Sequence, residues 1–152
     1  MATLSLTARA LRLLSNREHS RAELERKLAR HEEVPGTLAQ ALNALEAKDY
    51  INPERVAESL VHRRSAKLGV ARLRQELHAK GLAPQTIADA LLHARTTELE
   101  RAQTIWHKKF GNAPHDAHER AKQIRFLASR GFGGDTIRQV IAGYEDDFTD
   151  PA

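Results

Sequence analysis

The chain repeats one apolar pattern at a nearly constant interval along most of its length. The first two copies are separated by 49 residues: Leu24, Leu28, Pro35, Leu38 and Leu42 recur as Leu73, Leu77, Pro84, Ile87 and Leu91. A shift of 50 residues leads from the second copy to a third: Leu77, Gly81, Ile87 and Leu91 recur as Leu127, Gly131, Ile137 and Ile141. A fixed period of this size is typical of a tandem array of small supersecondary units. Arrays expose long surfaces to other macromolecules, so the sequence favours a binding role over an enclosed reaction site.

Each copy of the repeat carries apolar residues in steps of three and four, and no long stretch alternates as a strand does. The expected helices span 4–15, 20–31 and 35–48, then 53–67, 70–80 and 84–95, and finally 97–110, 117–130 and 135–143. The predicted fold is all-α: a tandem array of three three-helix repeats forming an elongated, curved stack of right- or left-handed twist. The expected divisions are repeats at 1–51, 52–96 and 97–144 and an acidic tail at 145–152. Units of about 50 residues are near the lower limit for an independent core, so neighbouring repeats should support one another.

Residues that prefer helix ends support these divisions. Ser20 and Glu23 have the spacing of a capping box, in which a hydroxyl accepts from a backbone N–H and a carboxylate reaches back. Pro35 and Pro84 are expected early in the third helices of their repeats, where a missing N–H costs little. The other end signals are Gly81 and Gly131, suited to left-handed turns after the second helices, and Asp135, suited to cap the last helix.

The composition excludes several classes of function. The 152 residues include no cysteine, so disulfides, thiolate metal sites and cysteine nucleophiles are ruled out. No apolar run approaches the roughly 18 to 20 residues that span a bilayer, and the first residues do not have the pattern of a secretion signal. The sequence also lacks a phosphate-binding loop and a nucleophile elbow. We therefore expect a cytoplasmic protein that is not an enzyme, needs no cofactor or metal and has no membrane contact.

Charge is distributed unevenly along the chain, which carries 24 basic and 20 acidic side chains for a net charge of +4. Four acids lie in the last eight residues, at Glu145, Asp146, Asp147 and Asp150, which leaves 24 basic and 16 acidic side chains before them. A basic body suits an anionic partner, either nucleic acid or an acidic protein surface. The alternative is a solvated helical surface of mixed charge. The acidic tail would mimic DNA charge or shield the basic body; the alternative is an end that is simply solvated.

Several segments resemble the RecX family when they are taken in order. The matching segments are Ala10-Leu11-Arg12-Leu13-Leu14-Ser15, Arg17 to Leu24, Tyr50 to Ala57, Gly69 to Leu77 with Lys80-Gly81-Leu82, and Ala121 to Phe132. The resemblance covers roughly 8–142. At the central joint the family usually has acidic residues where Asn52 and Pro53 stand and phenylalanine where Val56 stands.

Members of this family regulate the bacterial recombinase RecA. The resemblance implies a non-enzymatic regulator that lodges in the groove of the RecA–single-stranded DNA filament and inhibits or modulates recombinase and co-protease activity. It therefore implies a place in DNA repair, recombination and the SOS response. The implied partners are the RecA nucleoprotein filament, single-stranded DNA and, more weakly, double-stranded DNA, and we expect the protein to be a monomer.

The candidate binding residues are basic side chains in two stretches. They are Arg63, Arg64, Lys67, Arg72, Arg74 and Lys80 in the first, and Lys108, Lys109, Lys122, Arg125 and Arg130 in the second. Glu76 is the one acid between positions 61 and 82, and helical spacing places Arg63 and Lys67 on one face. Guanidinium and ammonium groups here would bind phosphates or carboxylates of the filament. The alternative is a solvated rim that keeps the protein soluble; Arg101 and Arg120 extend the second stretch.

Other side chains favour structural roles. Arg17, Arg21 and Glu25 belong to a mixed-charge stretch that predicts pairing within one helix. His115 and His118 lack a third convergent ligand, so we predict a metal-free segment. The aromatic residues expected to pack in the core are Trp106, Phe110, Phe126 and Phe132.

Two further functions compete with filament regulation. A direct DNA-binding helical-repeat protein would place a third helix in the major groove. Against it, the third helices of the first two repeats carry few bases, with Lys48 in one and Arg95 in the other. A generic helical scaffold with an unrelated protein partner is the remaining alternative.

Overall fold

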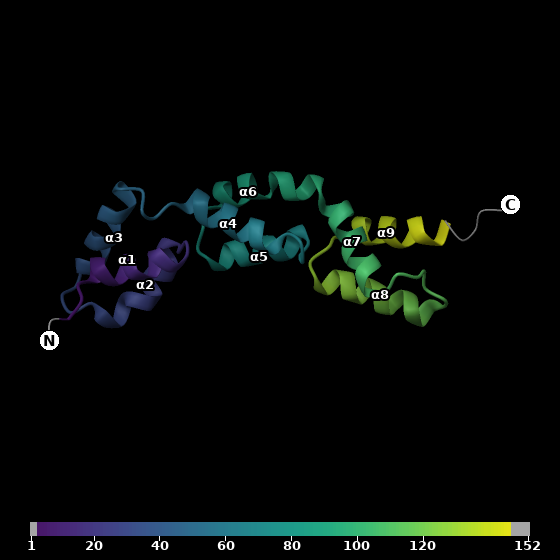
Figure 1. The fold of residues 1–152 in the computed structure, drawn as a ribbon, viewed down its shortest axis with the longest axis horizontal. Coiled ribbons are helices and arrows are strands. Elements are labelled where there is room, and N and C mark those ends of the chain that lie inside the picture. The colour runs from purple at the N-terminus through teal and green to yellow at the C-terminus, as the bar shows by residue number, and fades with distance from the viewer. Residues whose placement is uncertain (1–2, 147–152) are drawn as a thin grey trace.

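The computed structural model describes residues 3–146 and contains, within that range, helices but no strand. The first group of helices comprises α1 (Leu6–Asn16), α2 (Arg21–Leu28), the short 3-10 helix η1 (Ala29–His31) and α3 (Thr37–Ala47). The second comprises α4 (Pro53–Arg64), α5 (Val70–Ala79) and α6 (Pro84–Thr96). The third comprises α7 (Glu98–Lys109), α8 (Ala117–Ser129) and α9 (Gly134–Asp146). Figure 1 shows the three groups in a row, which confirms the predicted all-α tandem array.

The positions that define the sequence period are the core positions of the three groups. Leu42, Leu91 and Ile141 are fully buried at equivalent places, each in the third helix of its group. The other period-defining positions with 7% exposure or less are Leu24, Leu28, Leu38, Leu73, Leu77, Ile87, Leu127 and Ile137. Each group encloses its own cluster of these residues. The periodicity therefore records three small cores arranged in series.

The helix ends follow local sequence signals with two exceptions. Ser20 and Glu23 form the predicted capping box, since the Ser20 hydroxyl accepts from the Glu23 N–H and the Glu23 carboxylate from the Ser20 N–H, both at 3.1 Å. The prediction for Pro35 is wrong, because α3 begins at Thr37 after a left-handed Gly36 with φ of 92°. The cap predicted at Asp135 is also wrong: α9 begins one residue earlier, and Asp135 pairs with Arg138 in the first turn.

The acidic tail is described in part. Helix α9 continues through Asp146, three residues past the predicted end at position 143. Asp147 and Asp150 lie outside the described residues. The predicted repeat bounds at 1–51, 52–96 and 97–144 stay predictions.

The groups join through equivalent glycine turns. Gly81 and Gly131 follow α5 and α8 in left-handed conformations, with φ of 75° and 91°, as the sequence predicts. A Cβ atom at Gly81 would lie 2.7 Å from the Cβ of Ala22 in the first group. A Cβ atom at Gly131 would lie 2.6 Å from the backbone N of Arg72 in the second group. Each junction thus packs a glycine turn against the first residues of the preceding group's second helix, where a side chain would not fit.

The junction between the first and second groups is held by ion pairs. Lys80 Nζ lies 3.1 Å from the Glu23 carboxylate, and Arg55 Nε lies 2.8 Å from the Glu18 carboxylate. Glu23 is only 4% exposed and also binds Arg17 at 2.8 Å. Burial by itself raises the pKa of Glu23, but hydrogen bonds from Arg17, the Ser20 N–H and Lys80 outweigh it and lower that pKa to about 2.

The junction between the second and third groups is held by backbone hydrogen bonds. The Gly69 N–H donates to the Arg130 carbonyl at 2.8 Å, and the Ala71 N–H donates to the Gly131 carbonyl at 3.2 Å. The Val70 N–H donates to the Glu98 carboxylate at 3.1 Å. These donors are the N-cap Gly69 and the first two residues of α5. The third group therefore satisfies N–H groups that a helix start leaves without internal partners.

No helix within residues 3–146 is long and apolar enough to cross a membrane.

Candidate partner-binding site

A hollow lined by cations lies where the second and third groups meet. It encloses about 490 Å³, and its basic lining residues are Lys67, Lys108, Lys109 and Arg130. All four are among the candidate binding residues predicted from the sequence. The lining residues, all within the described part of the chain, include no carboxylate. We call this feature the junction hollow.

The four cations reach the junction hollow from the ends of three helices. Lys67 lies in the turn after α4, Lys108 and Lys109 are the last residues of α7, and Arg130 caps the C-terminus of α8. The negative end of a helix dipole favours a cation at each of these places. The helix dipole explains why each cation lies at a helix end, but it does not explain why the four lie together. Their convergence on one hollow comes from the packing of the second group against the third.

The lining of the junction hollow also has an apolar part, made of the half-buried Ile105 and Phe126 and the exposed Ala66. We call these apolar residues the floor and the four cations the rim. The Phe126 ring has Lys109 Nζ at 5.4 Å and Arg130 Cζ at 5.1 Å from its centroid. Phe110 meets the same ring edge-on, with centroids 5.4 Å apart and an interplanar angle of 89°. The sequence predicts Phe126 to be a core residue, but its ring is half-buried and forms part of a surface hollow.

Three other predicted binding residues have partners inside the protein. Arg64 binds the Glu76 carboxylate at 3.0 Å, across from α4 to α5. Arg72 donates to the Ser129 carbonyl at 3.1 Å across the second junction. Lys80 pairs with Glu23 across the first. These contacts give each side chain a structural role in addition to its proposed one.

The remaining candidates are exposed and lie outside the lining of the junction hollow. They are Arg63 at the end of α4, Arg74 on α5, and Lys122 and Arg125 on α8. The shared helical face predicted for Arg63 and Lys67 is wrong, because α4 ends at Arg64 and Lys67 lies in the following turn. The structure therefore divides the predicted basic surface into one concentrated site and several separate exposed cations.

Arg101 has a role that sequence analysis missed. Its guanidinium lies in the second junction and donates to the Ser65 carbonyl at 2.7 Å, to the Ala94 carbonyl at 2.7 Å, and to the Leu68 carbonyl. Burial lowers the pKa of Arg101 from its usual value. In sequence it looks like one more surface cation, because the carbonyls that it binds are up to 36 residues away along the chain.

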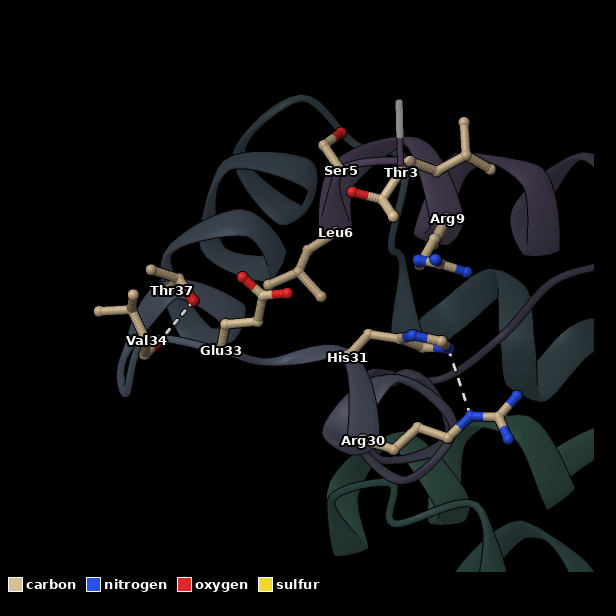
Figure 2. A pocket seen from close by; sticks show the side chains of 10 residues that line it. Thr3, Ser5, Leu6, Arg9, Arg30, His31, Glu33, Val34 and Thr37 are labelled. Atoms are coloured by element: carbon tan, nitrogen blue, oxygen red, sulfur yellow. Dashed lines mark hydrogen bonds between the residues drawn. The ribbon is translucent and has the colours of Figure 1, made fainter. Parts of the chain in front are cut away.

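A second hollow, of about 430 Å³, lies in the first group between α1, η1 and the start of α3. Figure 2 shows Arg9 beside His31. Arg30 Nε donates a hydrogen bond to His31 Nε2 at 3.2 Å. Desolvation and the charges of Arg9 and Arg30 lower the pKa of His31. Glu33 also lines this hollow, so its charge is mixed. Of these residues the sequence pointed only to Arg30, as part of the mixed-charge stretch, and it gave no signal for Arg9, His31 or Glu33.

The segment around His115 and His118, predicted to be free of metal, leads into the start of α8. The Asp116 side chain caps α8 by accepting from the Glu119 N–H at 2.8 Å. His115 Nε2 lies 3.8 Å from the Glu119 carboxylate. Within residues 3–146, no group of three or more His, Asp or Glu side chains is placed to hold a metal ion.

Fold and site together define the class of protein. Three small helical groups stand in a row, joined by glycine turns, and a hollow between two of them is lined by four cations and no carboxylate of the described residues. This is an elongated helical-repeat protein, a class that typically offers extended surfaces to other macromolecules.

Comparison with known proteins identifies the family. The models of the first, second and third three-helix domains of RecX match residues 8–45, 53–91 and 96–141. Regulatory protein RecX of Leptothrix cholodnii is 51% identical, over 95% of this chain and 93% of its own length. That of Ralstonia pickettii is 44% identical, over 94% and 90%. The crystal structure of RecX from Lactobacillus salivarius covers 92% of this chain and 94% of its own, with a TM-score of 0.78 at 25% identity. The chain belongs to the RecX family of regulatory proteins.

Proposed function

We propose that this chain is a non-enzymatic regulator that binds the groove of the RecA–single-stranded DNA filament and inhibits RecA's recombinase and co-protease activities. The observation that carries the proposal is the junction hollow, which gathers four of the predicted cations on an elongated protein. A long array with cations on its surface suits a long anionic fibre, because several weak contacts along one fibre add together. The similarity of this chain to RecX regulatory proteins over most of its length supports the same role.

Direct reading of DNA bases has less support. Helix α3 contains no lysine or arginine, and α6 and α9 contain one each, Arg95 and Arg138. A recognition helix needs basic or amide side chains along the face that enters the major groove. We therefore expect contact with DNA to be made through phosphates and to depend strongly on salt.

The test is RecA's DNA-dependent ATPase and strand exchange on preformed filaments. We expect the wild-type protein to inhibit both below equimolar ratios to RecA and to shorten filaments imaged by electron microscopy. Replacing Lys67, Lys108 and Lys109 together by alanine should weaken filament binding at least about tenfold, since three charge contacts are lost. Circular dichroism should show unchanged helicity, because all three side chains are exposed.

Two outcomes would contradict the proposal. One is an ATPase rate that stays unchanged at equimolar protein. The other is recovery of the chain on bare single-stranded DNA as readily as on filaments, which would favour the direct DNA-binding alternative. A pull-down from lysate with and without nuclease separates these cases, since RecA should be recovered only when the DNA is intact.

A further inference from the structure

The junction hollow combines two chemistries that one ligand must satisfy together. Its rim supplies cations on Lys67, Lys108, Lys109 and Arg130. Its floor is apolar, formed by Ala66, Ile105 and Phe126. A ligand that offers only negative charge would leave the floor in contact with water, and one that offers only apolar groups would leave the cations without partners.

A nucleic-acid strand matches only part of this arrangement. Proteins hold single strands by stacking bases on aromatic faces beside a basic groove. Phe126 is the aromatic side chain in the lining, and its ring already carries Lys109 and Arg130 at 5.4 and 5.1 Å and Phe110 against it at 5.4 Å. A base would have to displace these contacts before it could stack. Phosphates would meet the cations and leave Ala66 and Ile105 uncovered.

We propose that the junction hollow binds an acidic protein segment in which carboxylates alternate with apolar side chains. The carboxylates pair with the lysines and with Arg130, whose planar guanidinium accommodates a carboxylate in bidentate fashion. The apolar side chains cover the floor. A volume of about 490 Å³ holds a few side chains and no folded domain, so the ligand is a short segment of its partner.

The inference deepens the proposed function and rests on it in one respect: the segment belongs to the protein component of the filament that the chain regulates. It assigns the junction hollow to protein recognition and leaves contact with DNA to the other exposed cations. The separation of the two is testable with the intact chain and no recombinase.

The experiment measures fluorescence anisotropy of a short labelled peptide in which Glu and Asp alternate with Leu and Phe. One control peptide keeps the acids and replaces Leu and Phe by serine, and oligo(dT) of similar charge is the nucleic-acid control. We expect the apolar-acidic peptide to bind at least about tenfold more tightly than the serine peptide, because apolar side chains leave water. Oligo(dT) should not displace it.

Two variants test whether the peptide binds in the junction hollow. Lys108→Glu reverses one cation of the rim, and Ala66→Asp adds a carboxylate to the floor; both positions are exposed, so folding should be retained. Each should weaken peptide binding about tenfold. Lys48→Glu makes the same charge change as Lys108→Glu on an exposed residue at the end of α3 in the first group, outside the lining, and should alter binding by less than about twofold.

Equal affinity for the serine peptide, displacement by oligo(dT), or an equal effect of Lys48→Glu would overturn the inference. Inhibition of RecA filaments by the same wild-type preparation is measured in parallel. If the protein inhibits filaments but does not bind the peptide, the proposed function stands and this inference is wrong. If the protein binds the peptide in the junction hollow but leaves filaments unchanged, the inference about the hollow stands and the proposed function is wrong.

Discussion

Glu23 illustrates what individual residues do in this molecule and why sequence shows only half of it. Its capping box with Ser20 is legible from a spacing of three residues, and the structure confirms it. Its ion pair with Lys80 in the next group is not legible, because the partner is 57 positions away and only the packed junction brings them to 3.1 Å. The interpretation of mixed charge as pairing within one helix holds for Arg21 and Glu25, at 2.9 Å. It is wrong for Arg17, which follows α1 and pairs with Glu23 of α2 at 2.8 Å.

The lowered pKa of Glu23 predicts how the stability of the fold changes with pH. With a pKa of about 2 in the folded protein and 4.5 as its ordinary value, the carboxylate stabilises the fold fully above pH 4.5. That contribution is lost as the pH falls toward 2. Glu23→Gln should lower the free energy of unfolding at pH 7 by about 2 kcal/mol and flatten its slope between those limits.

The measurement is urea unfolding followed by circular dichroism at several pH values. The matched control is Glu25→Gln on the same helix, whose carboxylate is 52% exposed in an i,i+4 pair with Arg21. It should cost less than about 0.5 kcal/mol. Similar losses in the two variants would show that the buried ion pair adds nothing to the first junction.

At the scale of helices and turns, sequence is informative wherever a local signal decides the outcome. Pro84 begins α6 as predicted, and Gly81 and Gly131 take the left-handed conformation. The prediction fails at Pro35 because the chain first turns through Gly36, with a φ of 92° that other residues rarely adopt, and α3 begins only at Thr37. Local sequence preference does not predict that the turn after α8 packs against the backbone of Arg72.

The glycine turn after α8 therefore predicts a difference between two nearby glycines. Gly131→Ala should destabilise the protein by more than about 1 kcal/mol, because it forces alanine to a φ of 91° and sets a Cβ atom 2.6 Å from the Arg72 backbone N. Gly133→Ala in the same turn meets no heavy atom within 4 Å and should change stability by less than about 0.5 kcal/mol. Equal midpoints of urea unfolding for the two variants would contradict this account of the junction.

For the molecule as a whole, the period of 49 to 50 residues predicts three units in series but is silent on how firmly they are joined. The two junctions differ in kind. The first relies on side-chain ion pairs such as Arg55 with Glu18, and the second on backbone hydrogen bonds such as Gly69 with Arg130. The junction hollow lies at the second, so its cations keep their spacing only while the second and third groups stay docked.

Arg101 is the side chain on which that docking should depend most. It binds three backbone carbonyls, of Ser65, Leu68 and Ala94, that belong to the second group. Arg101→Met keeps most of the side-chain volume but leaves these carbonyls without their donor, which should weaken the junction by about 2 kcal/mol. In a linear array, loss of interface energy separates the unfolding of neighbouring units.

The chain reports this separation through its one tryptophan. Trp106 is fully buried in the third group, where its indole N–H binds Gln123 at 2.8 Å. In the wild type we expect tryptophan fluorescence and circular dichroism to follow nearly the same urea transition. In Arg101→Met the fluorescence transition should move to lower urea than the circular dichroism transition. Arg95→Met, which removes an exposed charge from α6, should leave them together. If both variants keep a single transition, the third group is coupled to the second by packing and backbone bonds without help from Arg101.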